Sequence, residues 1–125
     1  MITIRQAQID EFEEKRKRRF IEEVALEVRT HHPDECAELS DEELRDRVAE
    51  GFDRASNYGF RQKYSLSMFV QLQFLAAPNF DEYPTVRHLL THTAFEPDNK
   101  IDRIIESMRD SDWDDIRRRA GRVHQ

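Results

Sequence analysis

The clearest apolar pattern in the chain is an uncharged segment from Ser65 to Ala77. Its large apolar residues fall on every side of a helix and leave no polar face. They are Leu66, Met68, Phe69, Val70, Leu72, Phe74 and Leu75. Pro78 follows at once and disfavours further helix. We therefore predict a buried central helix over residues 65–77.

A long helix is predicted from Thr3 to about Arg29, where strong helix formers dominate. Apolar residues at helical spacing occur only in its second half, at Phe20, Ile21, Val24, Ala25 and Val28. Residues 13–19 are all charged, so that stretch should project from the core. We expect pairs four residues apart to stabilise it. The candidate pairs are Glu11 with Lys15, Glu13 with Lys17 and Glu14 with Arg18.

The next helix has a well-marked start and stop. Ser40 and Glu43 form a capping-box pattern, with Leu39 and Leu44 at the positions of a hydrophobic staple. Gly59 suits a left-handed stop after the helix. Gly51, inside the helix, predicts the close approach of another helix.

Prolines and a serine mark the remaining helix starts. Pro84 should open a helix with Val86, Leu89 and Leu90 inward, and Pro97 another with Ile101, Ile104, Ile105 and Met108 inward. Ser111 should cap a last short helix that stops at Gly121. The prediction is an all-α, single-domain bundle of five to six helices over residues 1–125. It has a long helix at about 3–29 and a compact bundle at about 40–120.

Charge and cysteine content narrow the classes of function. The 125 residues carry 20 basic and 26 acidic side chains, a net charge of −6, which disfavours nucleic acid as a partner. Sixteen of the cations are arginines, which suit protein interfaces. Cys36 is the only cysteine, and no signal peptide or membrane-spanning segment is recognised. We expect a cytoplasmic protein that does not enter a membrane.

Each candidate for catalysis or metal binding has a structural explanation. His88 and His92 lie four residues apart on one predicted helix but lack a further ligand nearby. Cys36 has acidic neighbours, which raise the pKa of a thiol. The carboxylates of residues 41–43 coincide with a helix N-terminus. We predict no catalytic residue, no metal and no cofactor.

Two arginine-rich runs and one tryptophan are candidates for interaction. Residues 15–19 and 117–119 could contact phosphates, but acidic neighbours offset both, and an ion-paired helix surface is the favoured interpretation. Trp113 is interpreted as an anchor of the last helix, with a partner interface as the alternative.

The block from Leu44 to Phe60 reads LRDRVAEGFDRASNYGF. An arginine, a glycine followed by an apolar residue, then Arg-Ala and Tyr-Gly resemble a pattern of small all-helical bacterial proteins of unassigned activity. These proteins are encoded among type VI secretion genes, near spike and effector components. The resemblance extends through the apolar helix, Phe80 and Pro84 to Lys100 and Ile101, over roughly residues 1–108. It implies an accessory or adaptor protein and transfers no catalytic residue.

The leading hypothesis is a non-catalytic adaptor that binds an effector, toxin or spike component of a bacterial secretion system. Its expected contact residues are Arg16 and Arg19 on the first helix and Tyr58, Gly59 and Phe60 at the corner after the second. A homo-oligomer stays open. The alternatives are a nucleic-acid-associated or regulatory helical protein, and a metal-dependent enzyme that uses His88 and His92.

Overall fold

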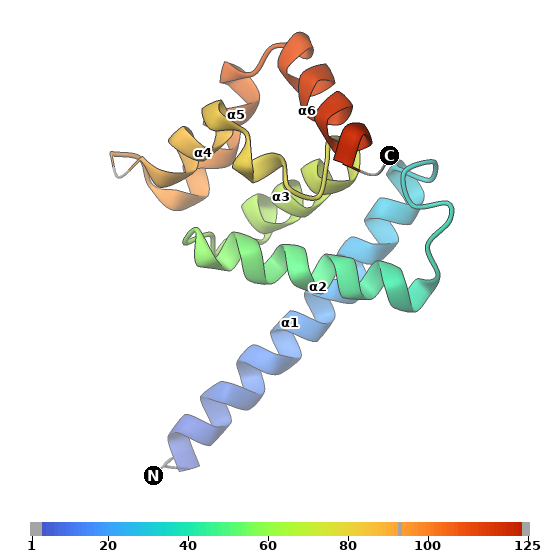
Figure 1. Ribbon diagram of the computed structural model, residues 1–125. Coiled ribbons are helices and arrows are strands. Elements are labelled where there is room, and N and C mark those ends of the chain that lie inside the picture. Colours follow the sequence, from blue (N-terminus) through green and yellow to red (C-terminus); the bar gives the residue numbers. More distant parts are fainter. Residues whose placement is uncertain (1–3, 93, 124–125) are drawn as a thin grey trace.

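The computed structural model describes residues 4–92 and 94–123, and every regular element in that part of the chain is helical (Figure 1). The predicted all-α, single-domain bundle is confirmed. The α-helices are α1 (Ile4–His31), α2 (Asp41–Asn57), α3 (Lys63–Leu75), α4 (Pro84–Thr91), α5 (Lys100–Ser107) and α6 (Asp110–Val123). Two 3₁₀ turns, η1 (Phe80–Glu82) and η2 (Pro97–Asn99), precede α4 and α5. None of the described helices is long and apolar enough to cross a membrane.

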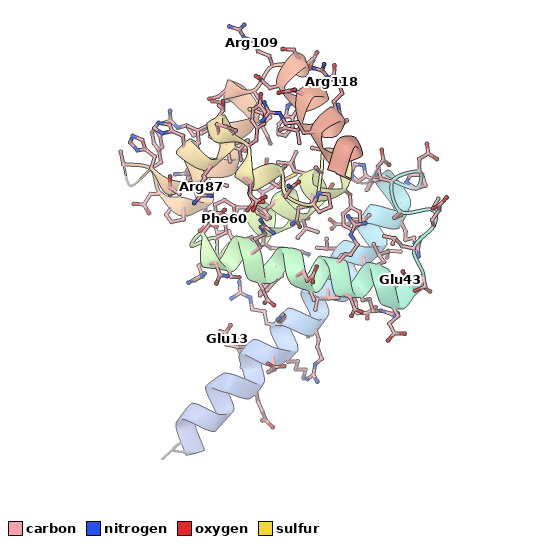
Figure 2. The ribbon with its side chains drawn as sticks, viewed as in Figure 1. Glu13, Glu43, Phe60, Arg87, Arg109 and Arg118 are labelled. Carbon is pink, nitrogen blue, oxygen red and sulfur yellow. The ribbon has the colours of Figure 1, made fainter. Side chains whose placement is uncertain are left out.

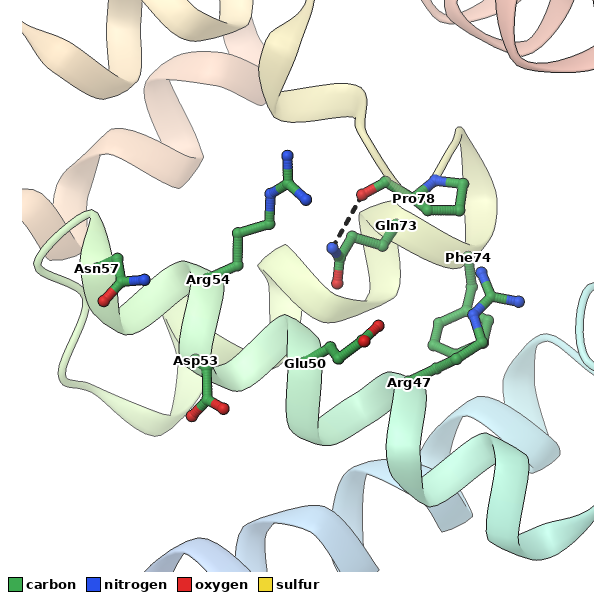
Figure 3. A pocket seen from close by; sticks show the side chains of 8 residues that line it. All are labelled: Arg47, Glu50, Asp53, Arg54, Asn57, Gln73, Phe74 and Pro78. Carbon is green, nitrogen blue, oxygen red and sulfur yellow. Dashed lines mark hydrogen bonds between the residues drawn. The ribbon is translucent and has the colours of Figure 1, made fainter. Parts of the chain in front are cut away.

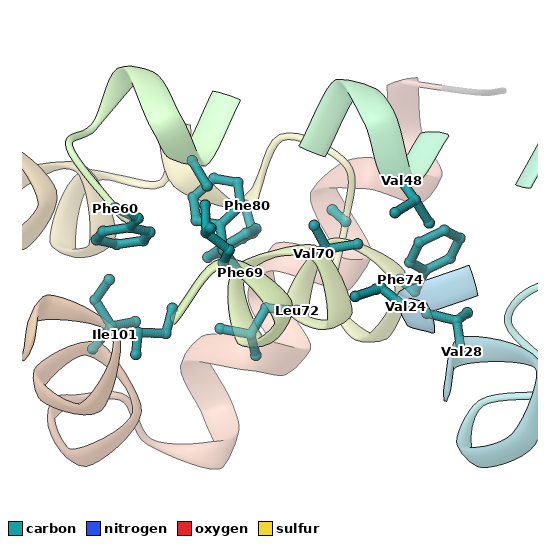
Figure 4. Packing of buried hydrophobic residues seen from close by; sticks show 14 of the residues in the cluster. Val24, Val28, Val48, Phe60, Phe69, Val70, Leu72, Phe74, Phe80 and Ile101 are labelled. Atoms are coloured by element: carbon teal, nitrogen blue, oxygen red, sulfur yellow. The ribbon is translucent and has the colours of Figure 1, made fainter. Parts of the chain in front are cut away.

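Helix α3 lies at the centre of the core, as predicted (Figure 4). Phe69 is fully buried, and its ring lies within 6.0 Å of the rings of Tyr58, Phe60 and Phe80. The helix ends at Leu75 rather than at residue 77, because Ala77 directly precedes Pro78. It also buries Gln73, whose amide donates to the carbonyl of Pro78 over 3.0 Å.

The C-terminal half of α1 packs on this core, while its N-terminal half extends beyond the bundle (Figure 1). Phe20, Val24 and Val28 are buried, whereas residues 11–16 are exposed. The predicted start at Thr3 lies outside the described residues. The ammonium of Lys17 lies 2.7 Å from Asp53 on α2, so its ion pair in the structure is with α2 instead of with Glu13 one turn away.

Helix α2 begins and ends as its sequence predicts. The Ser40 hydroxyl accepts from the Glu43 amide over 3.1 Å, and the Glu43 carboxylate accepts from the Ser40 amide over 3.1 Å. Gly59 has a φ of 97°, which is left-handed. A Cβ on Gly51 would lie 2.9 Å from a methyl of Val70, so the predicted close approach is to α3.

Several expectations for the second half of the chain are wrong. Helix α4 ends at Thr91, and His92 follows with an extended backbone (ψ 120°), so the two histidines do not share a helix. Ile105 points outward and is 38% exposed. Helix α6 begins at Asp110, which places Ser111 inside it, and continues to Val123 past Gly121. The Asp112 side chain, rather than Ser111, accepts from a backbone amide at this start, that of Arg109.

A side chain distant in sequence caps the N-terminus of α3. One carboxylate oxygen of Asp98, in η2, accepts from the amides of Arg61 and Gln62 over 2.9 Å each and from the Ser65 hydroxyl. Burial raises the pKa of Asp98, but the hydrogen bonds from Ser65, Gln62 and Arg61 outweigh that effect and hold this pKa below its ordinary value. The cap therefore joins η2 to the start of the central helix.

Phe69→Ala should lower the free energy of unfolding by about 3 to 5 kcal/mol, since it leaves a cavity among three aromatic rings. Urea denaturation followed by circular dichroism measures the change. Leu26→Ala, at a position 67% exposed on α1, is the control and should cost less than about 0.5 kcal/mol. Equal effects of the two variants would mean that the core is misplaced.

Asp98→Asn should lower the free energy of unfolding by about 1 kcal/mol at pH 7, because it removes the charge that caps α3. The lowered pKa of Asp98 means that its charge stabilises the fold above about pH 3.9, the value in an unfolded chain. This contribution is lost as the pH falls through the folded pKa. Urea denaturation at stepped pH should show the two proteins converging below about pH 4. A difference that persists there would contradict the capping role.

Candidate protein-binding groove

A groove runs between α1 and the corner where α2 leads into α3. Its outer part, of about 520 Å³, lies between the charged middle of α1 and residues Phe52, Phe60, Arg61 and Leu66. A smaller inner hollow of about 90 Å³ continues toward Phe20 and is bordered by Arg16, Arg19, Glu23 and Lys63. We call both parts together the α1 groove. The fold thus brings Arg16 and Arg19 beside the corner after α2.

The rim of the α1 groove is rich in cations. Its lining includes five basic and two acidic side chains, in a chain whose net charge is −6. The basic residues are Arg16, Lys17, Arg19, Arg61 and Lys63, and the acidic ones are Glu13 and Glu23. The groove is therefore a local positive region on an acidic protein.

Three of these cations have no carboxylate partner among the described side chains. Lys17 pairs with Asp53 and Lys63 with Glu23, whereas Arg16, Arg19 and Arg61 form no ion pair there. Arg16 donates to the carbonyl of Arg61 over 3.1 Å, and Arg61 donates to the carbonyls of Ser56 and Phe60. Backbone carbonyls supply hydrogen bonds but no negative charge, and the carboxylates nearest to Arg19 and Arg61, those of Glu23 and Asp98, lie beyond ion-pair distance.

The ion pair between Lys63 and Glu23 crosses from α3 to α1 at the edge of the inner hollow. The hydrogen bond from Lys63 lowers the pKa of Glu23, and the charge of Arg19 lowers it further. The same hydrogen bond raises the pKa of Lys63. Both groups stay charged at neutral pH, so the rim keeps its excess of positive charge.

The corner residues predicted to contact a partner lie mostly inward. Phe60 borders the groove but is fully buried, with its ring 5.8 Å from that of Phe69. Tyr58 is half-buried with its hydroxyl donating to Asp81, and Gly59 packs beside Pro97. Arg16 and Arg19 are exposed, so they are the predicted contact residues best placed to meet a partner.

Asp81 is a buried charged residue that the sequence pattern does not single out. One of its carboxylate oxygens accepts from Arg54 over 2.7 Å and from the Tyr58 hydroxyl over 2.8 Å. Its other oxygen is buried without a hydrogen-bond partner among the described atoms. Burial, followed by the hydrogen bond to Asp81, raises the pKa of Tyr58 to about 12, so the phenol stays protonated as a donor. This cluster ties η1 to the end of α2.

A second cleft of about 410 Å³ lies between α2 and the turn at Pro78 (Figure 3). Its polar groups are largely engaged within the protein. Arg54 binds Asp81, Asp53 binds Lys17, and the Arg47 guanidinium lies 4.7 Å from the centre of the Phe74 ring. The α1 groove, with its uncommitted cations, is therefore the stronger candidate for a binding site.

The other chemical candidates lie apart from the α1 groove. The rings of His88 and His92 are 5.7 Å apart, and within the described residues no third ligand is placed to share a metal ion with them. Cys36 is buried, and its thiol lies 3.3 Å from the carbonyl oxygen of His32. Residues Asp41 and Glu42 stand in the first turn of α2 with Glu43, which completes the capping box.

The C-terminal basic run is largely ion-paired. Arg117 pairs with Asp114, and both Arg118 and Arg119 pair with Asp115. Arg118 stands on α6 and Glu13 on the projecting part of α1, at opposite ends of the molecule (Figure 2). Trp113 is half-buried with its ring 6.5 Å from that of Phe80, which fits an anchor of α6.

No family model, curated protein or solved structure matches this chain.

The double variant Arg16→Glu/Arg19→Glu should change the free energy of unfolding by less than about 1 kcal/mol, because both side chains are exposed and unpaired. Arg54→Ala should instead cost about 1 to 3 kcal/mol, since it leaves the buried carboxylate of Asp81 without its cation. Thermal and urea denaturation compare the two. A large loss in the double variant would show that these arginines serve folding.

Proposed function

We propose that this chain is a non-catalytic, cytoplasmic adaptor that binds another protein through the α1 groove. The observation that carries the proposal is the set of exposed arginines without carboxylate partners above an apolar floor. Arginine pairs bidentately with carboxylates and is enriched in protein interfaces. Exposed cations contribute little to folding, so their concentration here is better explained by a partner.

The partner is proposed to be an effector, toxin or spike component of a bacterial secretion system. Support for this class comes from the resemblance of residues 44–60 to small helical proteins encoded beside such components. The acidic character of the chain outside the groove supports a protein partner over nucleic acid, because the remaining surface would repel phosphates. The single, buried Cys36 supports a cytoplasmic location.

Affinity capture from the source cells tests the proposal with two matched baits. Arg16→Glu/Arg19→Glu reverses two charges in the groove, and Lys15→Glu/Arg18→Glu reverses two on the same helix outside it. We expect the wild-type protein and the Lys15/Arg18 variant to capture the same stoichiometric partner, identified by mass spectrometry. The Arg16/Arg19 variant should lose it.

Three outcomes would overturn the adaptor proposal. They are the absence of any stoichiometric partner, turnover of a substrate by the purified protein alone, and salt-dependent retention of DNA that requires Arg16 and Arg19. The last outcome would assign the groove to nucleic acid instead.

A further inference from the structure

The inner hollow of the α1 groove has an apolar floor that is already well packed. Phe20 and Leu66 are buried, and the half-buried Phe52 lies with its ring 5.0 Å from that of Phe20. The ammonium of Lys17 lies 5.6 Å from the centre of the same Phe52 ring. Two contacts from α1 thus hold Phe52 in place, so the hollow is a formed feature of the surface.

The size of the hollow suits a small side chain. Its volume is about 90 Å³ and it opens into the outer part of the groove, so an aliphatic side chain such as leucine or valine can enter it. Because water gains few hydrogen bonds on such a floor, its replacement by an aliphatic group is favourable.

The charge at the rim limits which residues can flank an aliphatic side chain bound in the hollow. Arg16, Arg19 and Lys63 border the hollow, and the one carboxylate among them, that of Glu23, forms its ion pair with Lys63. If an apolar group flanked by cations entered the hollow, those cations would add to the repulsion among the basic side chains at the rim. Carboxylates on either side of the apolar group would instead pair with the two arginines.

We propose that the inner hollow receives one aliphatic side chain from an acidic segment of the partner, with flanking carboxylates bound by Arg16 and Arg19. This inference rests on the proposed adaptor function and specifies the chemistry of the segment that is bound. The partner's segment would carry an Asp or Glu on each side of a leucine-like residue.

The smallest probe of this chemistry is the tripeptide acetyl-Asp-Leu-Asp-amide. Titration at low ionic strength, followed by NMR of labelled protein, should give saturable shifts at Leu66 and Phe52 and none at Leu90, a buried residue of α4. Replacing the central leucine by alanine should weaken binding about tenfold, because each buried CH₂ contributes about fourfold and burial in an open hollow is partial. Replacing both aspartates by asparagine should weaken it about fivefold or more.

The same pair of protein variants completes the test. Arg16→Glu/Arg19→Glu should abolish the shifts, while Lys15→Glu/Arg18→Glu should retain them within about twofold. Equal binding of the leucine and alanine tripeptides, shifts outside the groove, or equal loss in both variants would overturn the proposal. A dimer in sedimentation analysis that only the Arg16/Arg19 variant lacks would overturn it too, by placing a second copy of the chain in the groove.

The experiments distinguish failure of the adaptor function from failure of the aliphatic anchor, by which we mean the aliphatic side chain proposed to enter the inner hollow. If cell-derived partners require Arg16 and Arg19 but the leucine and alanine tripeptides bind equally, only the aliphatic anchor is wrong. If no partner is captured, the adaptor function is wrong, whatever the tripeptides show.

Discussion

The arrangement of the bundle depends on covering a helix that has almost no polar face. Helix α3 can leave water only if other elements surround it, and three of them place four aromatic rings around or beyond Phe69. Tyr58 and Phe60 come from the end of α2, Phe80 from η1, and Trp113 from α6 by way of Phe80. Gly51 lets α2 approach α3 closely on another side.

Only the C-terminal half of α1 helps to cover the core. Its apolar positions, including Phe20, Val24 and Val28, cover one side of the core, and the charged stretch before them cannot be buried. Because a helix is rigid, the charged stretch continues in the direction of α1 and extends past the end of α2. The α1 groove arises where the charged stretch passes over Phe52 and the corner at Phe60.

Local signals in the sequence predicted much of this fold, and long-range contacts explain what they missed. The Ser40 capping box, the left-handed Gly59 and the apolar helix are encoded within a few residues each. Asp98 caps α3 although it lies 33 residues after Ser65 in the sequence, and no local pattern marks such a cap. Likewise Lys17 has an acceptable partner in Glu13 but pairs with Asp53, because α2 lies close enough to compete. The inward direction of Tyr58 and Phe60 is also a property of the assembled core.

The residue types of the candidate site could be predicted from the sequence, but the shape of the α1 groove could not. Arg16 and Arg19 could be recognised as exposed cations, yet their position beside an apolar hollow depends on the crossing of α1 and α2. In isolation these arginines repel each other, and water screens that repulsion only in part. Placing an anion among them relieves the repulsion and adds new ion pairs, while stability gains little from keeping them unpaired. The proposed acidic segment accounts for such a surface, because it would supply carboxylates to the arginines and its apolar residue would cover the exposed edge of Phe52.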